Sequence, residues 1–155
     1  MPLTRLIYVS LRQDRGEHDL DAILEASDRR NRDGGITGAL VVGERHFLQF
    51  LEGRRPDLGR CLARIARDLR HTDLQVISAG EARHRLFPDW TMRVMDQSLV
   101  MRMAPRRFGA ADVFSPQQMS QAVVEDLFRH LAVELGEPAP MPPPPSCPVV
   151  PQPTP

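Results

Sequence analysis

The sequence predicts an α+β fold, a ferredoxin-like βαββαββ sandwich with a five-stranded mixed sheet, two helices on one face and one or more C-terminal helices on the other. Three observations predict it. Short β-branched and aromatic runs alternate with amphipathic segments through residue 95. Gly43 and Glu44 join two of the apolar runs as a hairpin. Right-handed βαβ crossovers then place both helices on the same face of the sheet.

The first strand and helix come from the first thirty residues or so. The stretch "RLIYVSL" (5–11) is β-branched and aromatic, and strand alternation puts Tyr8 and Ser10 on one face. Over 18–31 the spacing of apolar residues is helical, and Ile23 lies in the middle of that stripe. The "DGG" that follows ends the helix.

The hairpin and the second helix follow. Segments 36–43 and 45–53 are the hairpin strands. A helix over 55–70 opens with Pro56 near its first turn. Its apolar side consists of Leu58, Cys61, Leu62, Ile65 and Leu69. Segments 73–85 and 89–95 are the last two strands.

The whole chain is expected to have three parts: a domain at 1–96, a helical extension at 97–136 and a tail at 137–155. In the extension, 115–135 begins with a cap-like Ser115-Pro116 and repeats an apolar residue every four positions, so we expect a helix that covers the open sheet face or forms a dimer surface. The tail holds ten of the fifteen prolines. It should be extended and outside the fold, either inert or a PxxP-type ligand.

Composition excludes several classes of function. Lys plus Arg and Asp plus Glu number 20 each, so the net charge is zero, which disfavours a general nucleic-acid binder. There is no apolar run long enough to span a membrane and no export leader, so a cytoplasmic protein is expected. The two cysteines and five histidines lack metal-ligand spacing, and no metal site is predicted.

Gln49 is the residue that points to a ligand. It lies in the middle of the apolar stretch "HFLQFLEG" (46–53), and burying an amide without partners costs about 1–3 kcal/mol per unmet group. If the first and third strands are neighbours, Tyr8 and Gln49 meet on the helix-covered face. A slot between the helices would then have Ile23 and Ile65 as walls. Its mouth would carry Arg64 and Asp68, one turn apart on the second helix, together with Arg70 and His71. The slot suits a flat ligand, although side chains filling it would explain the same pattern.

The same residues resemble the BLUF domain, the blue-light sensor that uses flavin. "LIYVS" resembles its first strand, "DLDAILEASDRRNRDGGITGALVVGERHFLQFLEG" its helix-to-hairpin core, "IARDLRH" its second helix end and "FPDWTM" its last-strand motif. The resemblance runs from residue 4 to about residue 95, in order and with compatible spacing.

This resemblance implies a bound flavin, FAD or else FMN or riboflavin. It implies a photoswitch made of Tyr8 and Gln49 with Trp90 and Met92 beside them. Ile23 and Ile65 would sandwich the ring, and Asn31 and Gln49 would bond its polar edge. Arg64, Asp68, Arg70 and His71 would lie near the ribityl and phosphate portion, and Arg30 either reaches the flavin or is solvated. Cys61 is expected to be an inert core residue.

The resemblance also implies how such a protein signals. Light would drive an electron and a proton from Tyr8, the amide of Gln49 would rearrange, and the last strand would pass the change to the C-terminal helix. The output would be a signalling partner in trans or a homo-oligomer, with no nucleic-acid or membrane partner and no catalytic activity. Two alternatives stay open: a small ferredoxin-like flavoenzyme that uses the same slot, and an assembly domain that has lost its cofactor.

Overall fold

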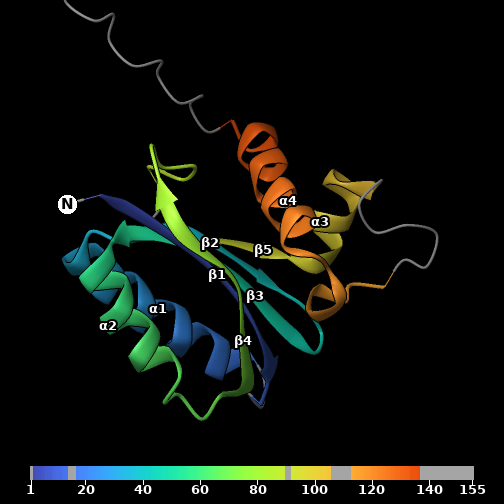
Figure 1. The fold of residues 1–155 in the computed structure, drawn as a ribbon. Helices are drawn as coiled ribbons and strands as arrows, with labels where there is room; N and C mark the ends of the chain where they lie inside the picture. Colours follow the sequence, from blue (N-terminus) through green and yellow to red (C-terminus); the bar gives the residue numbers. More distant parts are fainter. Residues whose placement is uncertain (1, 14–16, 90–91, 106–112, 137–155) are drawn as a thin grey trace, which may run out of the picture.

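The computed structural model describes residues 2–13, 17–89, 92–105 and 113–136, and it has the predicted α+β architecture (Figure 1). The strands are β1 (Leu3–Arg12), β2 (Thr37–Val42), β3 (His46–Arg54), β4 (His71–Ala82) and β5 (Arg93–Asp96). The helices are α1 (Glu17–Gly34), α2 (Arg55–Ile65), α3 (Gln97–Met103) and α4 (Gln121–Glu134), and a short 3-10 helix, η3 (Pro116–Gln118), precedes α4.

The five strands form one sheet in the order β4-β1-β3-β2-β5. β1 pairs antiparallel with β3, and Tyr8 lies directly opposite Gln49, so the predicted adjacency of these two residues is confirmed. β3 is the central strand, and all but its two end residues are buried, which matches its apolar sequence on both faces. β5 pairs in parallel with β2 at the sheet edge.

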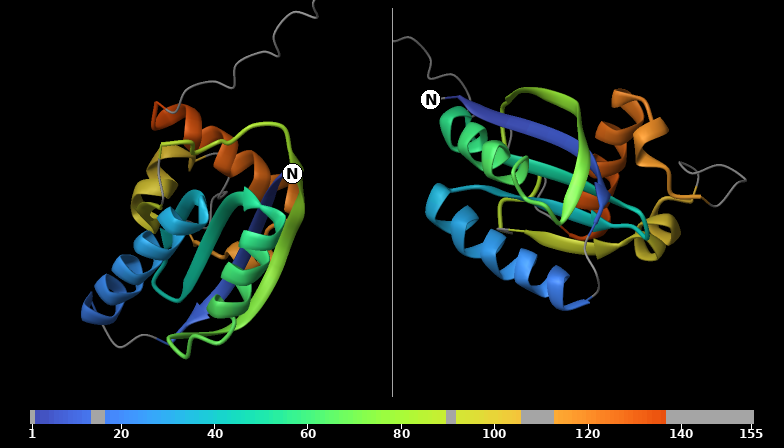
Figure 2. Two further views of the ribbon diagram at one scale, coloured as in Figure 1. Left: turned by 90° about the vertical axis from the view of Figure 1, so that its left-hand side faces the viewer. Right: turned by 90° about the horizontal axis from the view of Figure 1, so that it is seen from below.

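Two helical layers cover the two faces of the sheet. Figures 1 and 2 show α1 and α2 on one face and α3 and α4 on the other. Alternation along β3 divides the core accordingly: Leu51 packs with the α2 side, whereas Leu48 and Phe50 join the larger core under α4. The sheet therefore separates a helix-lined slot from a second core that the C-terminal region completes.

Two glycines in the "DGGITG" stretch are needed for this packing. Gly35 has a φ of +62°, which favours glycine, and it follows the end of α1. At Gly38 an added Cβ would lie 2.0 Å from the carbonyl oxygen of Phe50, so only glycine lets β2 approach β3 this closely.

The second helix is shorter than predicted. It ends at Ile65 rather than at residue 70, so Asp68 lies in the following loop and not one turn beyond Arg64 on the helix. The His71 ring bonds the Ile65 carbonyl at 2.6 Å, and the Asp68 carboxylate accepts the Arg70 backbone N–H at 3.0 Å. These local bonds compete with another helical turn. Leu69, predicted on the apolar side, is 92% exposed.

The C-terminal helix and the last strand also differ from their predicted bounds. Residues 115–135 do not form one helix, because Met119 is extended and the Ser120 hydroxyl caps a new helix by accepting the Val123 N–H at 3.3 Å. The last strand, predicted over 89–95, is β5 at Arg93–Asp96, where it pairs with β2, and residues 90 and 91 lie outside the described residues. Trp90 and the tail at 137–155 lie outside the described residues.

Candidate functional site

A slot lies between α1 and α2 on the sheet face where Tyr8 and Gln49 are neighbours. Two adjoining cavities make up the slot and share several lining residues: Ile23, Ser27, Gln49, Ile65 and Asp68. α1 supplies Ile23 and Ser27 from one side and α2 supplies Ile65 from the other, because these residues lie on the sheet-facing stripe of their helices. Both predicted walls therefore line the slot.

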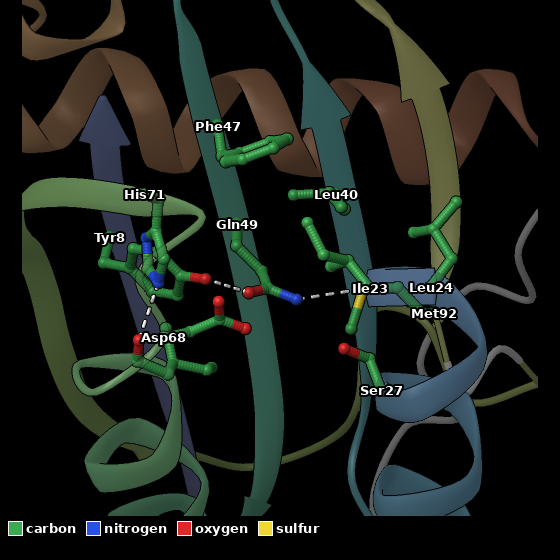
Figure 3. A pocket seen from close by; sticks show the side chains of 11 residues that line it. Tyr8, Ile23, Leu24, Ser27, Leu40, Phe47, Gln49, Asp68, His71 and Met92 are labelled. Atoms are coloured by element: carbon green, nitrogen blue, oxygen red, sulfur yellow. Dashed lines mark hydrogen bonds between the residues drawn. The ribbon is translucent and has the colours of Figure 1, made fainter. Parts of the chain in front are cut away.

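The floor of the slot is a row of three side chains, Tyr8, Gln49 and Met92 (Figure 3). The Tyr8 hydroxyl donates a hydrogen bond to Gln49 Oε1. On the other side of the amide, Gln49 Nε2 lies 3.3 Å from Met92 Sδ. Tyr8 is 4% and Gln49 6% exposed, so the amide is held in an almost dry site. A thioether is a weak acceptor, so this amide retains capacity for a stronger acceptor in the slot.

Burial sets the protonation state of Tyr8. Desolvation raises the pKa of the Tyr8 phenol far above its ordinary value of 10.0, and the nearby Cys61 and Asp68 add to the shift. The phenol therefore stays protonated and remains the donor in its bond to Gln49. The His71 ring lies 6.4 Å from the Tyr8 ring, centroid to centroid, and packs beside it in Figure 3.

The second cavity contains another buried amide, Asn31, near the end of α1. Asn31 is 2% exposed, and its backbone carbonyl accepts the Ile36 N–H at 2.8 Å, which fixes the turn after α1. The Cys61 thiol donates to Asn31 Oδ1 at an Sγ–Oδ1 distance of 3.9 Å. Cys61 is buried as predicted, but it also lines the slot, a position that its sequence did not predict.

Polar groups surround the mouth of the slot. Arg70 donates to Asp68 at 2.8 and 2.6 Å, and these hydrogen bonds lower the pKa of the Asp68 carboxyl. Exposed Arg30 and Arg64 line the second cavity with Asp68 and Arg70. His71 lines the first cavity. All four predicted mouth residues thus meet at the slot even though only Arg64 belongs to α2.

Several lining residues besides Cys61 were not predicted from the sequence, although they follow the same periodicity as the residues of the slot walls. Ser27 is one helical turn beyond Ile23, and Cys61 is one turn before Ile65. On the sheet, Phe47 alternates with Gln49, and Leu40 lies opposite Gln49 on β2. Trp90 cannot be placed with them because it lies outside the described residues.

Among the residues the structure describes, no three His, Cys, Asp or Glu side chains come together as a metal site. Within the same ranges, no helix has the length and apolar character needed to cross a membrane.

Comparison with known proteins gives one family match. The family described as sensors of blue-light using FAD, BLUF, matches residues 3–93. Among curated proteins, photoactivated adenylate cyclase subunit beta of Euglena gracilis is 31% identical over 105 residues, which cover 66% of this chain and 12% of that protein. The blue light- and temperature-regulated antirepressor BluF of Escherichia coli (strain K12) is 31% identical over 98 residues, covering 63% of this chain and 24% of the antirepressor. The chain thus matches only a small part of either relative.

Solved structures match over more of their length. The dark-state structure of BlrB, a BLUF protein, is 29% identical with a TM-score of 0.73, and the match covers 86% of this chain and 97% of BlrB. The BlsA ground state is 25% identical with a TM-score of 0.75, covering 84% and 88% of the two chains. These two matches extend into the C-terminal helices as well as the sheet, since each covers more of the chain than residues 3–93.

Proposed function

Because the chain belongs to the BLUF family of sensors of blue light using FAD, we propose that it detects blue light through a flavin held in the slot between α1 and α2. BLUF domains bind FAD or FMN. One observation carries the proposal: the buried Tyr8 hydroxyl donates to Gln49, whose amide nitrogen meets only the Met92 sulfur among the described side chains.

The residues present fit a flavin ring. The polar edge of the ring alternates carbonyl acceptors, the N5 acceptor and the N3–H donor, and a primary amide can both donate and accept. Two buried amides, Gln49 and Asn31, line the second cavity together. Ile23 and Ile65 present aliphatic surface on opposite sides. We propose that Asn31 and Gln49 hold the ring edge and that Ile23 and Ile65 sandwich the ring.

We further propose that the charged mouth holds the chain of the cofactor. Arg64, Asp68, Arg70 and His71 would bind its ribityl and phosphate portion, with Arg30 as an added cation on the second cavity. Guanidinium groups bind phosphate well because they offer several fixed donors. The Arg70–Asp68 pair keeps one of these guanidiniums oriented beside the slot.

The proposed photoswitch consists of residues that already touch. A bound flavin would supply the absorption of blue light and an excited state that takes an electron from a nearby phenol. Tyr8 would give that electron, and its hydroxyl proton would pass to Gln49 Oε1 along the existing hydrogen bond. When the electron and proton return, the Gln49 amide would be left turned, with nitrogen toward Tyr8 and oxygen away from it. No bond is made and nothing is consumed.

The turned amide would present oxygen instead of N–H to Met92, whose sulfur accepts weakly but has no hydrogen to donate, so the contact would be lost and Met92 would be displaced. Met92 lies directly before β5, and β5 leads into α3. We propose that Trp90 takes part beside Met92 and that output passes through α3 and α4 to a signalling protein in trans or to a second copy of the chain. In this proposal residues 1–96 form the flavin-binding domain, 97–136 the extension and 137–155 a tail, with no catalytic output of their own.

The test is a visible spectrum of the purified protein with bound flavin before and after a blue flash. The proposal expects a small red shift that reverses in the dark and is lost in Gln49→Leu and Tyr8→Phe. Ser10→Ala is the matched control, because Ser10 is a buried residue of β1 on the same face as Tyr8 and does not line either cavity. A flavin that only bleaches with an added electron donor would favour a redox enzyme instead, and failure to bind flavin would exclude both.

A further inference from the structure

The slot contains two buried amides, Gln49 and Asn31, and they have different neighbours. Gln49 Nε2 lies against the Met92 sulfur, a weak acceptor that leaves this amide able to turn. Asn31 is 2% exposed, and Cys61 Sγ lies 3.9 Å from its Oδ1. Asn31 belongs to α1 and Cys61 to α2, so this contact joins the two helices that bound the slot. The thiol therefore acts on the amide that is not part of the proposed photoswitch.

The Cys61 thiol is protonated in this environment. Cys61 is 4% exposed, and burial raises the pKa of its thiol, although the positive charges of Arg64 and Arg30 oppose that rise. A carbonyl oxygen only accepts hydrogen bonds, so the S–H group is the donor and Asn31 Oδ1 the acceptor. A thiol is a weak donor, and a nearby cation makes its hydrogen more positive.

These neighbours also determine which way round the Asn31 amide lies. A half-turn of a primary amide exchanges its oxygen and its NH2 group with little change of shape. In the observed orientation the oxygen meets the thiol hydrogen, and Arg30 and Arg64, whose charges act on that thiol, line the same cavity. In the reversed orientation the NH2 group would meet this donor instead, close to the same two cations. Hydrogen bonding and charge thus both favour the oxygen toward Cys61.

We propose that Cys61 is a positioning residue of the flavin site, whose thiol holds the Asn31 oxygen so that the NH2 group of this amide stays a donor to a carbonyl of the bound ring. This inference rests on the proposed function, since it needs a flavin in the slot. The Asn31 backbone is fixed as well, because its carbonyl accepts the Ile36 N–H at 2.8 Å. Asn31 then keeps one orientation while Gln49 turns, and the ring edge retains a fixed contact in the dark and in the light.

Two substitutions distinguish a hydrogen-bond donor from a packing residue at position 61. Cys61→Val keeps an apolar side chain but has no hydrogen to donate, whereas Cys61→Ser keeps a donor on a smaller, more polar side chain. If the thiol positions Asn31, the serine variant should bind the flavin carbonyls as the wild-type protein does and the valine variant should not. If Cys61 only fills space, the valine variant should resemble the wild-type protein and the serine variant should be the disturbed one.

The first measurement is the infrared S–H stretching band of the full-length protein, which lies apart from other protein bands. The chain has two cysteines, so Cys147→Ala is the matched control that assigns the band of Cys61. We expect this band at the lowered frequency of a hydrogen-bonded thiol, in the dark and after a blue flash. In Asn31→Leu, which has a similar shape but no acceptor, it should move to the frequency of a free thiol.

The second measurement follows the flavin itself, and it uses only the Cys61 variants, so it holds even if Asn31→Leu does not fold. In Cys61→Val a carbonyl band of the flavin should rise in frequency, because the Asn31 amide no longer donates to it in a fixed orientation. The affinity for flavin should fall about two- to tenfold, the effect of one net hydrogen bond. Cys61→Ser should keep both values close to those of the wild-type protein.

Each contrary result is specific. A Cys61 band at the free-thiol frequency, or one that Asn31→Leu leaves unchanged, would overturn the proposal, and so would unchanged flavin carbonyl bands in Cys61→Val. Loss of the hydrogen-bonded thiol band after the flash would show that Asn31 turns together with Gln49. The thiol band can be recorded without flavin. A wild-type protein that shows the bonded thiol but binds no flavin would contradict the proposed function, and with it the role toward the ring, while the Cys61–Asn31 contact would stand.

Discussion

Tyr8 is the only tyrosine of the chain, and its surroundings make it a direct probe of the site. Its phenol is buried, bonded to Gln49 and protected from ionisation by desolvation. A tyrosine with an ordinary pKa ionises near pH 10. Because burial raises this pKa, the Tyr8 proton stays in place at neutral pH and past the pH at which an ordinary tyrosine ionises, so the donor to Gln49 is present before any light arrives.

This state has a measurable consequence at alkaline pH. Below about pH 10 both folded and unfolded chains hold the Tyr8 proton; above it only the folded chain does, so the free energy of unfolding should fall as pH rises. We expect tyrosinate absorbance to appear together with loss of circular dichroism in an alkaline titration, and not before. Tyr8→Phe should lack the absorbance change. Tyrosinate absorbance in a still-folded protein would contradict the buried, protonated phenol.

The positions of Tyr8 and Gln49 were predictable because strand alternation and strand order determine them. Their contact follows from a register in which each is opposite the other. The contact of Cys61 with Asn31 was not predictable. A cysteine on the apolar side of a helix is usually a core residue, and nothing in the sequence indicates which residue of the other helix it faces. The roles proposed for these residues stay predictions.

The existence of the strands and helices was predicted better than the residues at which they begin and end. In the sequence, the helical spacing of apolar residues continues beyond α2 to Leu69. Hydrogen bonds made by the Asp68 and His71 side chains end the helix at Ile65 instead. The spacing of apolar residues does not show where side-chain hydrogen bonds will replace the backbone bonds of a helix. The break at Met119 has the same origin, since Ser120 caps α4 whereas the predicted cap residue, Ser115, makes no capping bond.

The junction of β5 and α3 depends on another cap. Asp96 ends β5 and accepts the Ser98 backbone N–H at 2.8 Å, and bonds from Ser98 lower the pKa of its carboxyl. Asp96→Ala should destabilise α3 by about 1 kcal/mol, the usual value of an N-cap. Asp96→Asn is the control, because asparagine caps equally well. Amide exchange over 97–103 measures both; equal exchange in the two variants would mean that the cap does not hold α3.

The sheet divides the buried side chains of the protein into two sets, one on each face. Phe128 of α4 lies 4.9 Å from Phe50, ring centroid to ring centroid, in the core on the face opposite the slot. Tyr8 and Ile65 belong to the cluster on the slot face. Stability supplied by α4 and affinity for a ligand in the slot should therefore vary independently.

Phe128→Ala tests this separation. Removing a fully buried phenylalanine should lower the free energy of unfolding by about 3–5 kcal/mol. The increase in melting temperature caused by added flavin should be the same as in the wild-type protein. Val133→Ala is the control on the same helix, because Val133 is exposed, and it should change stability by less than about 0.5 kcal/mol. A smaller flavin effect in Phe128→Ala would show that the two faces are coupled in the dark.

The position of β1 has a consequence for how the protein is made. Of the five strands of this sheet, β1 leaves the ribosome first, yet its two neighbours are β3 and β4, and β4 ends at Ala82. Contacts between residues so distant in sequence form slowly, because the intervening chain must first be closed into a loop. During synthesis, β1 waits with an unpaired edge until β4 has emerged. The slot floor of Tyr8, Gln49 and Met92 is complete only when residue 92 has also emerged, so a newly made chain can acquire its cofactor only after that point.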